Sequence, residues 1–136
     1  MSDRPKVLIV DDEERFRSTM RKLLTIRGLF AETAGSGEEA LRELTANPYD
    51  VVILDVRMPE MDGVRALAEI RKIDPEIAVL IMTGYASVDT AKEIIKMGAH
   101  DYLLKPYDIE DLMEKIEAAY DRKVARKRLQ ESGPTA

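Results

Sequence analysis

Polar side chains directly follow each of four short apolar runs in this sequence. The runs are residues 7–10, 51–54, 77–82 and 102–104, and the residues after them are Asp11 with Asp12, Asp55, Thr83, and Lys105. The set contains three carboxylates, one hydroxyl and one ammonium group. In open parallel α/β sheets, ligands bind outside the carboxyl ends of the strands. If the runs are strands of such a sheet, the five side chains meet at one edge.

These residue types predict a site that binds a hard cation and a phosphate group. Three neighbouring carboxylates repel one another, so a cation is expected between them. Oxygen ligands without His or Cys favour Mg²⁺ first and Mn²⁺ next, and such an ion keeps positions open for phosphate oxygens. Lys105 and Thr83 suit contacts to those oxygens, and a carboxylate beside them is a plausible nucleophile for an acyl phosphate.

Each of these residues also has a structural interpretation. An Asp at the end of a strand often caps a helix or forms a turn, a Lys is usually solvated, and a Thr can simply end a strand. Taken singly, the residues do not define a site. Their occurrence at four strand ends in succession favours the functional interpretation.

The elements that must position these groups alternate between strand and helix. The four runs are continuous and rich in β-branched residues, which is typical of strands buried on both faces, and residues 30–34 form a weaker candidate. Helical spacing appears between them, at Phe16, Met20, Leu23 and Leu24, with Gly28 as a terminator. The expected N-terminal caps of the later helices are Ser36, Asp62, Ser87 and Asp108, and the expected end of the fourth is Gly98.

The resulting order is (βα)₅, which predicts a single-domain α/β fold with a doubly wound parallel sheet. The 136 residues suit one compact domain, expected over residues 1–121, with a basic helix extension and flexible tail over residues 122–136. We interpret the basic residues of that extension as a solvated face, with a contact surface as the alternative.

Composition narrows the class of protein. Hydrophobic residues make up 45% and charged residues 35% of the chain, which is typical of a globular protein. The absence of cysteine excludes disulfides, thiol catalysis and Cys-ligated metals. The net charge of −5 argues against direct nucleic-acid binding, and no membrane segment or signal peptide is expected, so a cytoplasmic location is predicted.

The ordered motifs resemble the receiver domain of bacterial two-component response regulators, over about residues 6–119. They are residues 7–13 (VLIVDDE), 50–59 (DVVILDVRMP), 61–63 (MDG), 82–85 (MTGY) and 98–106 (GAHDYLLKP). The resemblance implies a flavodoxin-like fold with strand order 2-1-3-4-5. It also implies that a sensor histidine kinase, or a histidine phosphotransfer protein, donates a phosphoryl group to Asp55.

The resemblance assigns roles to individual residues. Asp12 and Asp55 would ligate Mg²⁺ directly together with the backbone carbonyl of Arg57, while Asp11 acts mainly through water. The phosphate-binding and switch residues would be Lys105, Thr83, Gly84 and Tyr102, and a cis bond would precede Pro106. Phosphorylation would then rebuild the face of the fourth helix, fifth strand and fifth helix. An unknown downstream target would bind this face, and a phosphorylation-linked homodimer could form through it.

The resemblance also implies a phosphoacceptor that catalyses only its own phosphorylation and dephosphorylation, not an enzyme with a separate substrate. Arg57 and Tyr85 are hypothesised to set the dephosphorylation rate. His100, the only histidine, is expected to be exposed and without a catalytic role.

Three rival interpretations remain. An aspartyl-phosphate phosphatase would need a second Asp two residues after the nucleophile, where Arg57 stands. A flavin-binding module would need a Gly/Ser/Thr phosphate loop after the first strand, where the acidic pair stands. A phosphorylation-independent interaction module remains open, although the intact set of acids, Thr83 and Lys105 argues against it.

Overall fold

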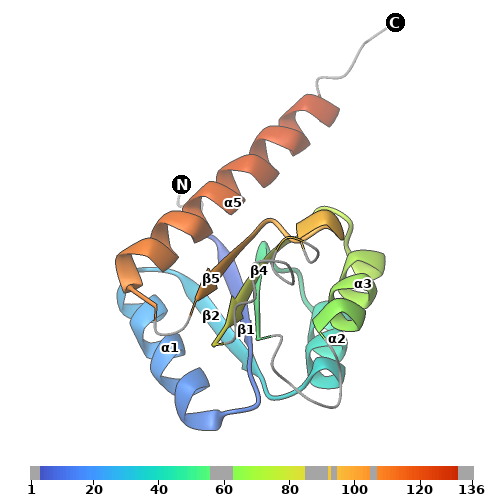
Figure 1. The fold of residues 1–136 in the computed structure, drawn as a ribbon. Helices are drawn as coiled ribbons and strands as arrows, with labels where there is room; N and C mark the ends of the chain where they lie inside the picture. The colour runs from blue at the N-terminus through green and yellow to red at the C-terminus, as the bar shows by residue number, and fades with distance from the viewer. Residues whose placement is uncertain (1–3, 56–62, 85–91, 93–94, 105–106, 132–136) are drawn as a thin grey trace, which may run out of the picture.

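The fold is a central parallel sheet covered by helices on both faces (Figure 1). The computed structural model describes residues 4–55, 63–84, 92, 95–104 and 107–131. The strands are β1 (Lys6–Val10), β2 (Phe30–Ala34), β3 (Val51–Asp55), β4 (Ala78–Thr83) and β5 (Asp101–Leu104). The described helices are α1 (Glu14–Ile26), α2 (Gly37–Ala46), α3 (Gly63–Ile73) and α5 (Ile109–Glu131).

The sheet has the order β2-β1-β3-β4-β5, and every adjacent pair is parallel. This confirms the predicted order 2-1-3-4-5. The chain reverses its direction of strand addition between β1 and β3, which is where open α/β sheets place their ligands. The loops after β1 and β3 therefore open on the same edge of the sheet.

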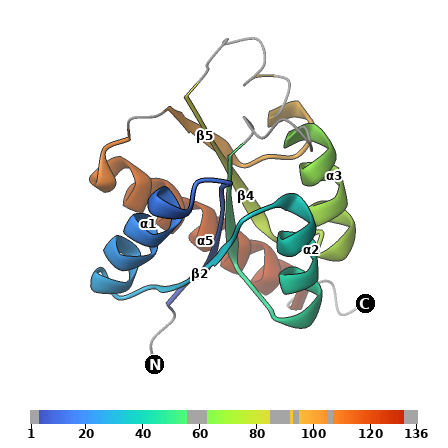
Figure 2. The ribbon, with the colours of Figure 1, turned by 90° about the horizontal axis from the view of Figure 1, so that it is seen from below.

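Side chains alternate along the strands between two separate hydrophobic cores, one on each face of the sheet. One core joins even-numbered residues of β1 and β3, such as Leu8 and Val52, to α2 and α3 through Leu44 and Leu67. The other core joins odd-numbered residues of the same strands to α1 and α5, and it includes Val7, Ile9, Ile53, Met20 and Ile116. Both faces of the strands are buried, which explains why their sequences are apolar without alternation. Figure 2 views the molecule from below relative to Figure 1 and shows the two helical layers on either side of the sheet.

Local signals explain where the helices begin and end. Gly28 has a φ of 90°, its N–H donates to the Thr25 carbonyl, and the Leu29 N–H donates to the Leu24 carbonyl. This is the Schellman arrangement, which needs the left-handed conformation that glycine adopts readily. Ser36 Oγ accepts from the Glu39 N–H at 3.1 Å, and Asp108 Oδ1 accepts from the Glu110 N–H at 2.9 Å, so both predicted caps are confirmed.

The expected caps of the third and fourth helices, Asp62 and Ser87, lie outside the described residues. Of the fourth helix itself, only Lys92, Ile95 and Lys96 are described as helical. Gly98, at the expected end of the fourth helix, has a φ of 115°.

The basic extension belongs to α5, which continues to Glu131 and projects beyond the sheet (Figure 1). No helix in the described part of the chain combines the length and apolarity needed to cross a membrane.

Candidate functional site

Asp11 is held at the carboxyl end of β1 by its backbone and its side chain. Its N–H donates to the Ala34 carbonyl at 3.1 Å, which extends the pairing of β1 with β2 by one residue. Its carboxylate oxygen Oδ1 accepts from the Glu13 N–H at 2.9 Å. The side chain is 1% exposed. Asp11 therefore does form a local turn, as its structural interpretation expects.

Asp55 is the last residue of β3 and is also only 1% exposed. It lies opposite Met82 in the register of β3 and β4. Since Val51, Ile53 and Asp55 point to the same face of a strand, the carboxylate continues a row whose other members belong to the α1–α5 core. A carboxylate in such a position is rarely buried without a functional or electrostatic reason.

Asp11, Asp12 and Asp55 form one acidic cluster. Each offers a carboxylate oxygen, and these oxygens lie within 4.8 Å of one another. Asp12 is exposed, whereas the other two are buried. At that separation two unit charges repel by roughly 3 kcal/mol at an effective dielectric constant near 20. The donor set therefore fits a hard divalent cation, with Asp12 marking the side open to solvent.

A neighbouring cation, Arg17 on α1, supports the backbone of this loop. Its Nη1 donates to the Asp11 carbonyl at 2.8 Å, and its guanidinium packs against Gly35, where an added Cβ would lie 3.1 Å from Nη1. The helical spacing of α1 places Arg17 within reach of the loop, but the sequence contains no signal that selects it over Arg15 or Arg21. Arg17 is thus a site-positioning residue that the sequence reasoning missed.

The remaining predicted site residues are only partly described. Thr83 ends β4 at the same edge of the sheet, paired with Leu104, and Gly84 follows it exposed to solvent; for Thr83 only the backbone is described. Tyr102 on β5 is half-buried and packs against the core that contains α2 and α3. Arg57, Lys105 and Pro106 lie outside the described residues, as does Tyr85, so their roles stay predictions.

One expectation about the rest of the molecule is wrong. His100 is half-buried rather than exposed, and its ring faces α5. Its backbone N–H donates to the Val79 carbonyl at 2.7 Å. Burial, followed by the nearby cation Arg122, lowers its pKa below the ordinary 6.5. The turn before β5 looked solvated in the sequence, since nothing local reveals that α5 covers it.

Comparison with protein families gives a match over most of the chain. Residues 7–117 match the sequence model of the response regulator receiver domain. This range contains all five strands except Lys6, and all three members of the acidic cluster.

Comparison with curated proteins gives transcriptional regulators. The chain is 44% identical over 117 residues to the transcriptional regulatory protein ZraR of Escherichia coli K12, covering 86% of this chain and 26% of that protein. It is 34% identical over 119 residues to the transcriptional regulatory protein PrrA of Mycobacterium tuberculosis, covering 88% of this chain and 51% of that protein. The chain thus spans about a quarter to a half of the length of these relatives.

Solved structures agree with the fold. A response regulator receiver domain protein from Clostridium thermocellum superposes with a TM-score of 0.84 at 41% identity, covering 89% of this chain and 98% of that one. The beryllofluoride-activated NtrC4 receiver domain, described as a dimer, gives a TM-score of 0.82 at 36% identity, covering 87% of this chain and 98% of that one.

Proposed function

Because the chain belongs to the response regulator receiver domain family, we propose that Asp55 is its phosphoacceptor in two-component signal transduction. The observation that carries this assignment is the burial of Asp55 at the end of the middle strand, with two further carboxylates within 4.8 Å. Asp11 is tied to its loop by the Glu13 N–H, and Asp12 is on the open side of the cluster. Asp55 is the member placed at the centre of the sheet edge.

The cation in this proposal is Mg²⁺, or Mn²⁺ in its place. Asp12 and Asp55, with the Arg57 carbonyl, would hold it directly, and Asp11 would act mainly through water. When bound, the cation offsets the negative charge that otherwise keeps an anionic phosphoryl donor away. The oxygen-only donor set of the cluster supports a hard ion over a transition metal that prefers nitrogen or sulfur.

The reaction is a phosphoryl transfer between side chains. An Asp55 carboxylate oxygen attacks the phosphorus of a phosphohistidine on a sensor kinase or phosphotransfer protein. The new O–P bond forms as the N–P bond breaks, and the imidazole keeps the electron pair. Hydrolysis of the acyl phosphate by water returns Asp55 and releases inorganic phosphate. The domain therefore acts on its own side chain and has no separate substrate to turn over.

The proposed switch transmits phosphorylation to the neighbouring strands. Lys105 and Thr83 would contact the phosphoryl oxygens, Gly84 leaves the backbone beside Thr83 adaptable, and a cis bond would precede Pro106. Tyr102, paired with Ile81 in the sheet and half-buried, is suited to follow a shift at Thr83. The rebuilt face would include the fourth helix, β5 and α5. Phosphorylation-linked pairing of two chains would use this face, as would the downstream target.

Transcriptional control is a proposal for the protein in which this domain acts, based on the regulators that it matches. We further propose that the domain works in the cytoplasm, where a kinase core can reach it, and that its body makes no direct contact with nucleic acid. The domain boundary near residue 121 also remains a prediction, because α5 continues through that position to Glu131.

Incubation with acetyl phosphate tests the proposed function directly. With Mg²⁺ present, the intact mass should rise by one phosphoryl group, and chelation of the metal should abolish the gain. Asp55→Asn should not be modified. Asp121→Asn, which removes an exposed carboxylate on α5, is the matched control and should be modified like the wild type. Modification of Asp55→Asn to the same extent would overturn the assignment.

A phosphorylation-independent interaction module is the alternative function. It predicts that the wild type gains no mass under any condition while partner binding persists. An aspartyl-phosphate phosphatase would instead release phosphate from phosphomonoesters in Mg²⁺, and we expect no such turnover.

A further inference from the structure

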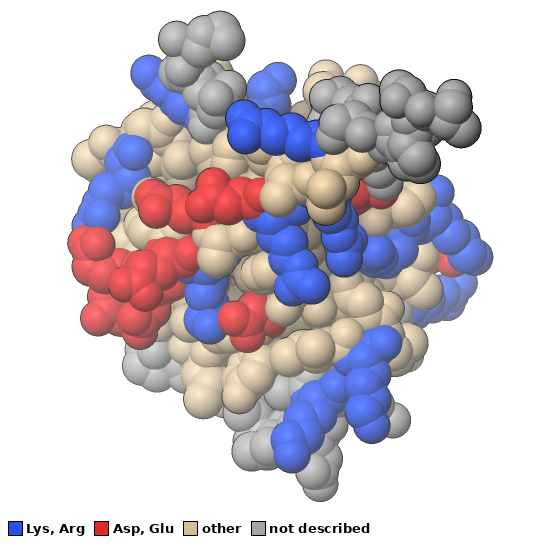
Figure 3. All heavy atoms as spheres, turned by 90° about the horizontal axis from the view of Figure 1, so that it is seen from above, with Lys and Arg blue, Asp and Glu red and all other residues tan. Residues whose placement is uncertain are grey.

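The end of the sheet opposite the acidic cluster contains a cavity of about 300 Å³ whose lining includes five basic residues. They come from three separate segments: Arg71 from α3, His100 from the turn before β5, and Arg122, Lys123 and Arg126 from α5. Figure 3 views this end of the molecule and shows Lys and Arg side chains gathered across its centre and one flank. We refer to this hollow as the basic cavity.

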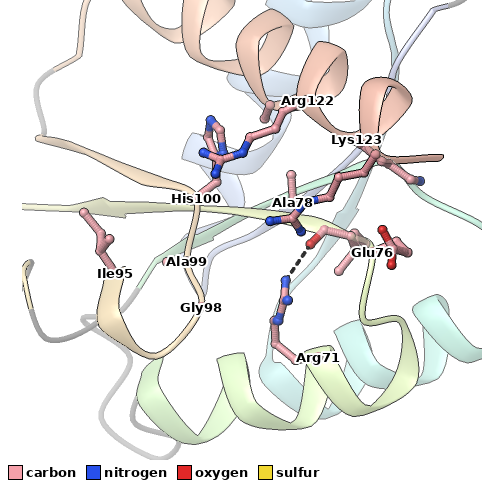
Figure 4. Close-up of a pocket in the computed structure, with 12 residues that line it drawn as sticks. Arg71, Glu76, Ala78, Ile95, Gly98, Ala99, His100, Arg122 and Lys123 are labelled. Carbon is pink, nitrogen blue, oxygen red and sulfur yellow. Dashed lines mark hydrogen bonds between the residues drawn. The ribbon is translucent and has the colours of Figure 1, made fainter. Parts of the chain in front are cut away.

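The rest of the lining is mostly small and apolar. It consists of Ile77, Ala78, Ile95, Gly98, Ala99 and Ala119, together with the acidic Glu76. In Figure 4, Arg71 reaches in from α3 while Arg122 and Lys123 approach from α5 on the other side. A ligand in this position would be held between two helices that otherwise lie on opposite faces of the sheet.

Arg71 is pre-positioned in the cavity. Its Nη1 donates to the Ile77 carbonyl at 3.1 Å, which fixes the plane of the guanidinium. Gly98 makes room for it, since an added Cβ there would lie 3.2 Å from Arg71 Nε. A guanidinium has five N–H donors in a planar fork, and that shape matches the oxygens of phosphate. An arginine already held by the backbone loses less side-chain entropy on binding an anion.

Arg122 and Arg126 supply further positive charge. They are four residues apart on α5, so they share one face of the helix, and both are exposed. Like charges at this spacing repel, and within the described residues neither forms an ion pair. Lys123 is different, because its Nζ donates to Asp50 Oδ1 at 2.9 Å. Glu76 itself lines the cavity, and the nearby carboxylates of Asp50 and Asp101 are paired with Lys123 and Lys115.

His100 lines the cavity and can report on its charge. Its pKa is lowered first by burial and then by the charges of Arg122, Lys115 and Arg126, against the opposing effect of Asp101. A bound anion would cancel part of that field and raise the pKa again. Because His100 is the only histidine, its ring signals report on this cavity alone.

We propose that the basic cavity binds a small anion carrying a phosphate group. The volume suits a small ligand, since it lies at the lower end of the range for small-molecule pockets. A long polyanion such as DNA fits poorly, because Asp and Glu side chains occupy the other flank of the same face and the net charge is −5. The ligand class is therefore a free or metabolite-borne phosphate, and this site is independent of Asp55.

Titration of the full chain tests the proposal, with inorganic phosphate in one arm and AMP in the other. Metal is omitted so that the acidic cluster does not contribute. The proton signals of the His100 ring should shift saturably, its pKa should rise, and calorimetry should give the same dissociation constant. Arg122→Gln and Arg126→Gln should each weaken binding by about tenfold. A stronger response to AMP than to phosphate would identify a metabolite-borne group as the ligand.

Lys22→Gln on α1 is the matched control, since it removes one exposed positive charge from a remote helix and should bind phosphate like the wild type. Sodium chloride at equal ionic strength controls for screening. The proposal is overturned if chloride reproduces the shift, if the double variant of Arg122 and Arg126 binds like the wild type, or if citrate binds as tightly as phosphate. Displacement of phosphate by duplex DNA at equal phosphate concentration would also overturn it.

Discussion

Lys123 on α5 donates to the Asp50 carboxylate at 2.9 Å, and the other oxygen of that carboxylate accepts from the Lys6 N–H at 2.8 Å. The Asp50 carboxylate, directly before β3, thus connects α5, β1 and β3, three segments far apart in the sequence. The Lys123 and Asp50 side chains are 18% and 24% exposed, so water screens the pair only partly. This contact fixes α5 across the amino end of the sheet, beside the basic cavity.

The first prediction concerns the stability that this contact provides. Lys123→Met keeps the aliphatic stem and removes the charge, and we expect it to lower the free energy of unfolding by about 1–2 kcal/mol. Urea unfolding measures the difference. The control is Lys72→Gln, which breaks the exposed pair with Glu69 and should change stability by less than about 0.5 kcal/mol. Equal effects of the two substitutions would show that the Asp50 contact has no special weight.

The second prediction concerns the metal. Because the folded acidic cluster gathers three carboxylates that the unfolded chain disperses, Mg²⁺ should stabilise the fold. At a free concentration of 100 times the dissociation constant, the gain is about 2.7 kcal/mol. Thermal unfolding with and without Mg²⁺ measures it.

Asp11→Asn separates charge from hydrogen bonding in that experiment. The amide oxygen can still accept from the Glu13 N–H, so the loop should keep its shape while most of the response to Mg²⁺ is lost. Asp121→Asn should respond like the wild type. A full Mg²⁺ response in Asp11→Asn would show that the charge of Asp11 does not contribute to holding the ion.

The third prediction concerns pH. The folded-state pKa of His100 lies below its ordinary value of 6.5, chiefly because of burial and Arg122. As the pH falls through about 6.5, the unfolded chain therefore takes up a proton before the folded one does, and stability is lost until the folded-state pKa is passed. His100→Asn should not show this loss. The measurement is the free energy of unfolding of both proteins between pH 7.5 and pH 5, a range on either side of the ordinary pKa of 6.5. Parallel curves would contradict the assignment.

The fold was predictable because its signals are local and mutually consistent. The runs around Ile9 and Ile53 are apolar on both faces of the strand. Ser36 and Asp108 cap helix starts with their side-chain oxygens, and Gly28 ends a helix with a positive φ. The carboxylates of the site were predictable for the same reason. A strand end is visible in the sequence, and parallel strands bring their ends together.

Contacts between distant segments were not predictable in this way. The covering of His100 by α5 depends on how a helix of 23 residues crosses the sheet, which no local pattern specifies. The same holds for the basic cavity. Arg71, Arg122 and Arg126 look like ordinary solvated cations in the sequence, and only the packing of α3 and α5 at one end of the sheet brings them together.

The fourth prediction concerns Arg17, which contacts the backbone of the proposed metal site. Its bond to the Asp11 carbonyl holds the loop that carries Asp11 and Asp12, so its loss should loosen the spacing of two carboxylates proposed to hold the ion. We expect Arg17→Gln to weaken Mg²⁺ binding by roughly tenfold, a typical cost for a residue that supports metal ligands. Titration calorimetry with Mg²⁺ measures this, and the rate of modification by acetyl phosphate should fall with it.

Arg21 provides the matched control for that experiment. It lies one turn further along α1, and its Nε donates to the Ala31 carbonyl at 3.2 Å, so it makes the same kind of bond to a strand away from the acidic cluster. Arg21→Gln should leave Mg²⁺ affinity unchanged even if it costs similar stability. Arg17→Lys should recover only part of the affinity, because an ammonium group cannot reproduce both the directed bond and the packing against Gly35. If the Arg17 and Arg21 variants lose Mg²⁺ affinity to the same degree, the effect comes from α1 as a whole and Arg17 has no positioning role.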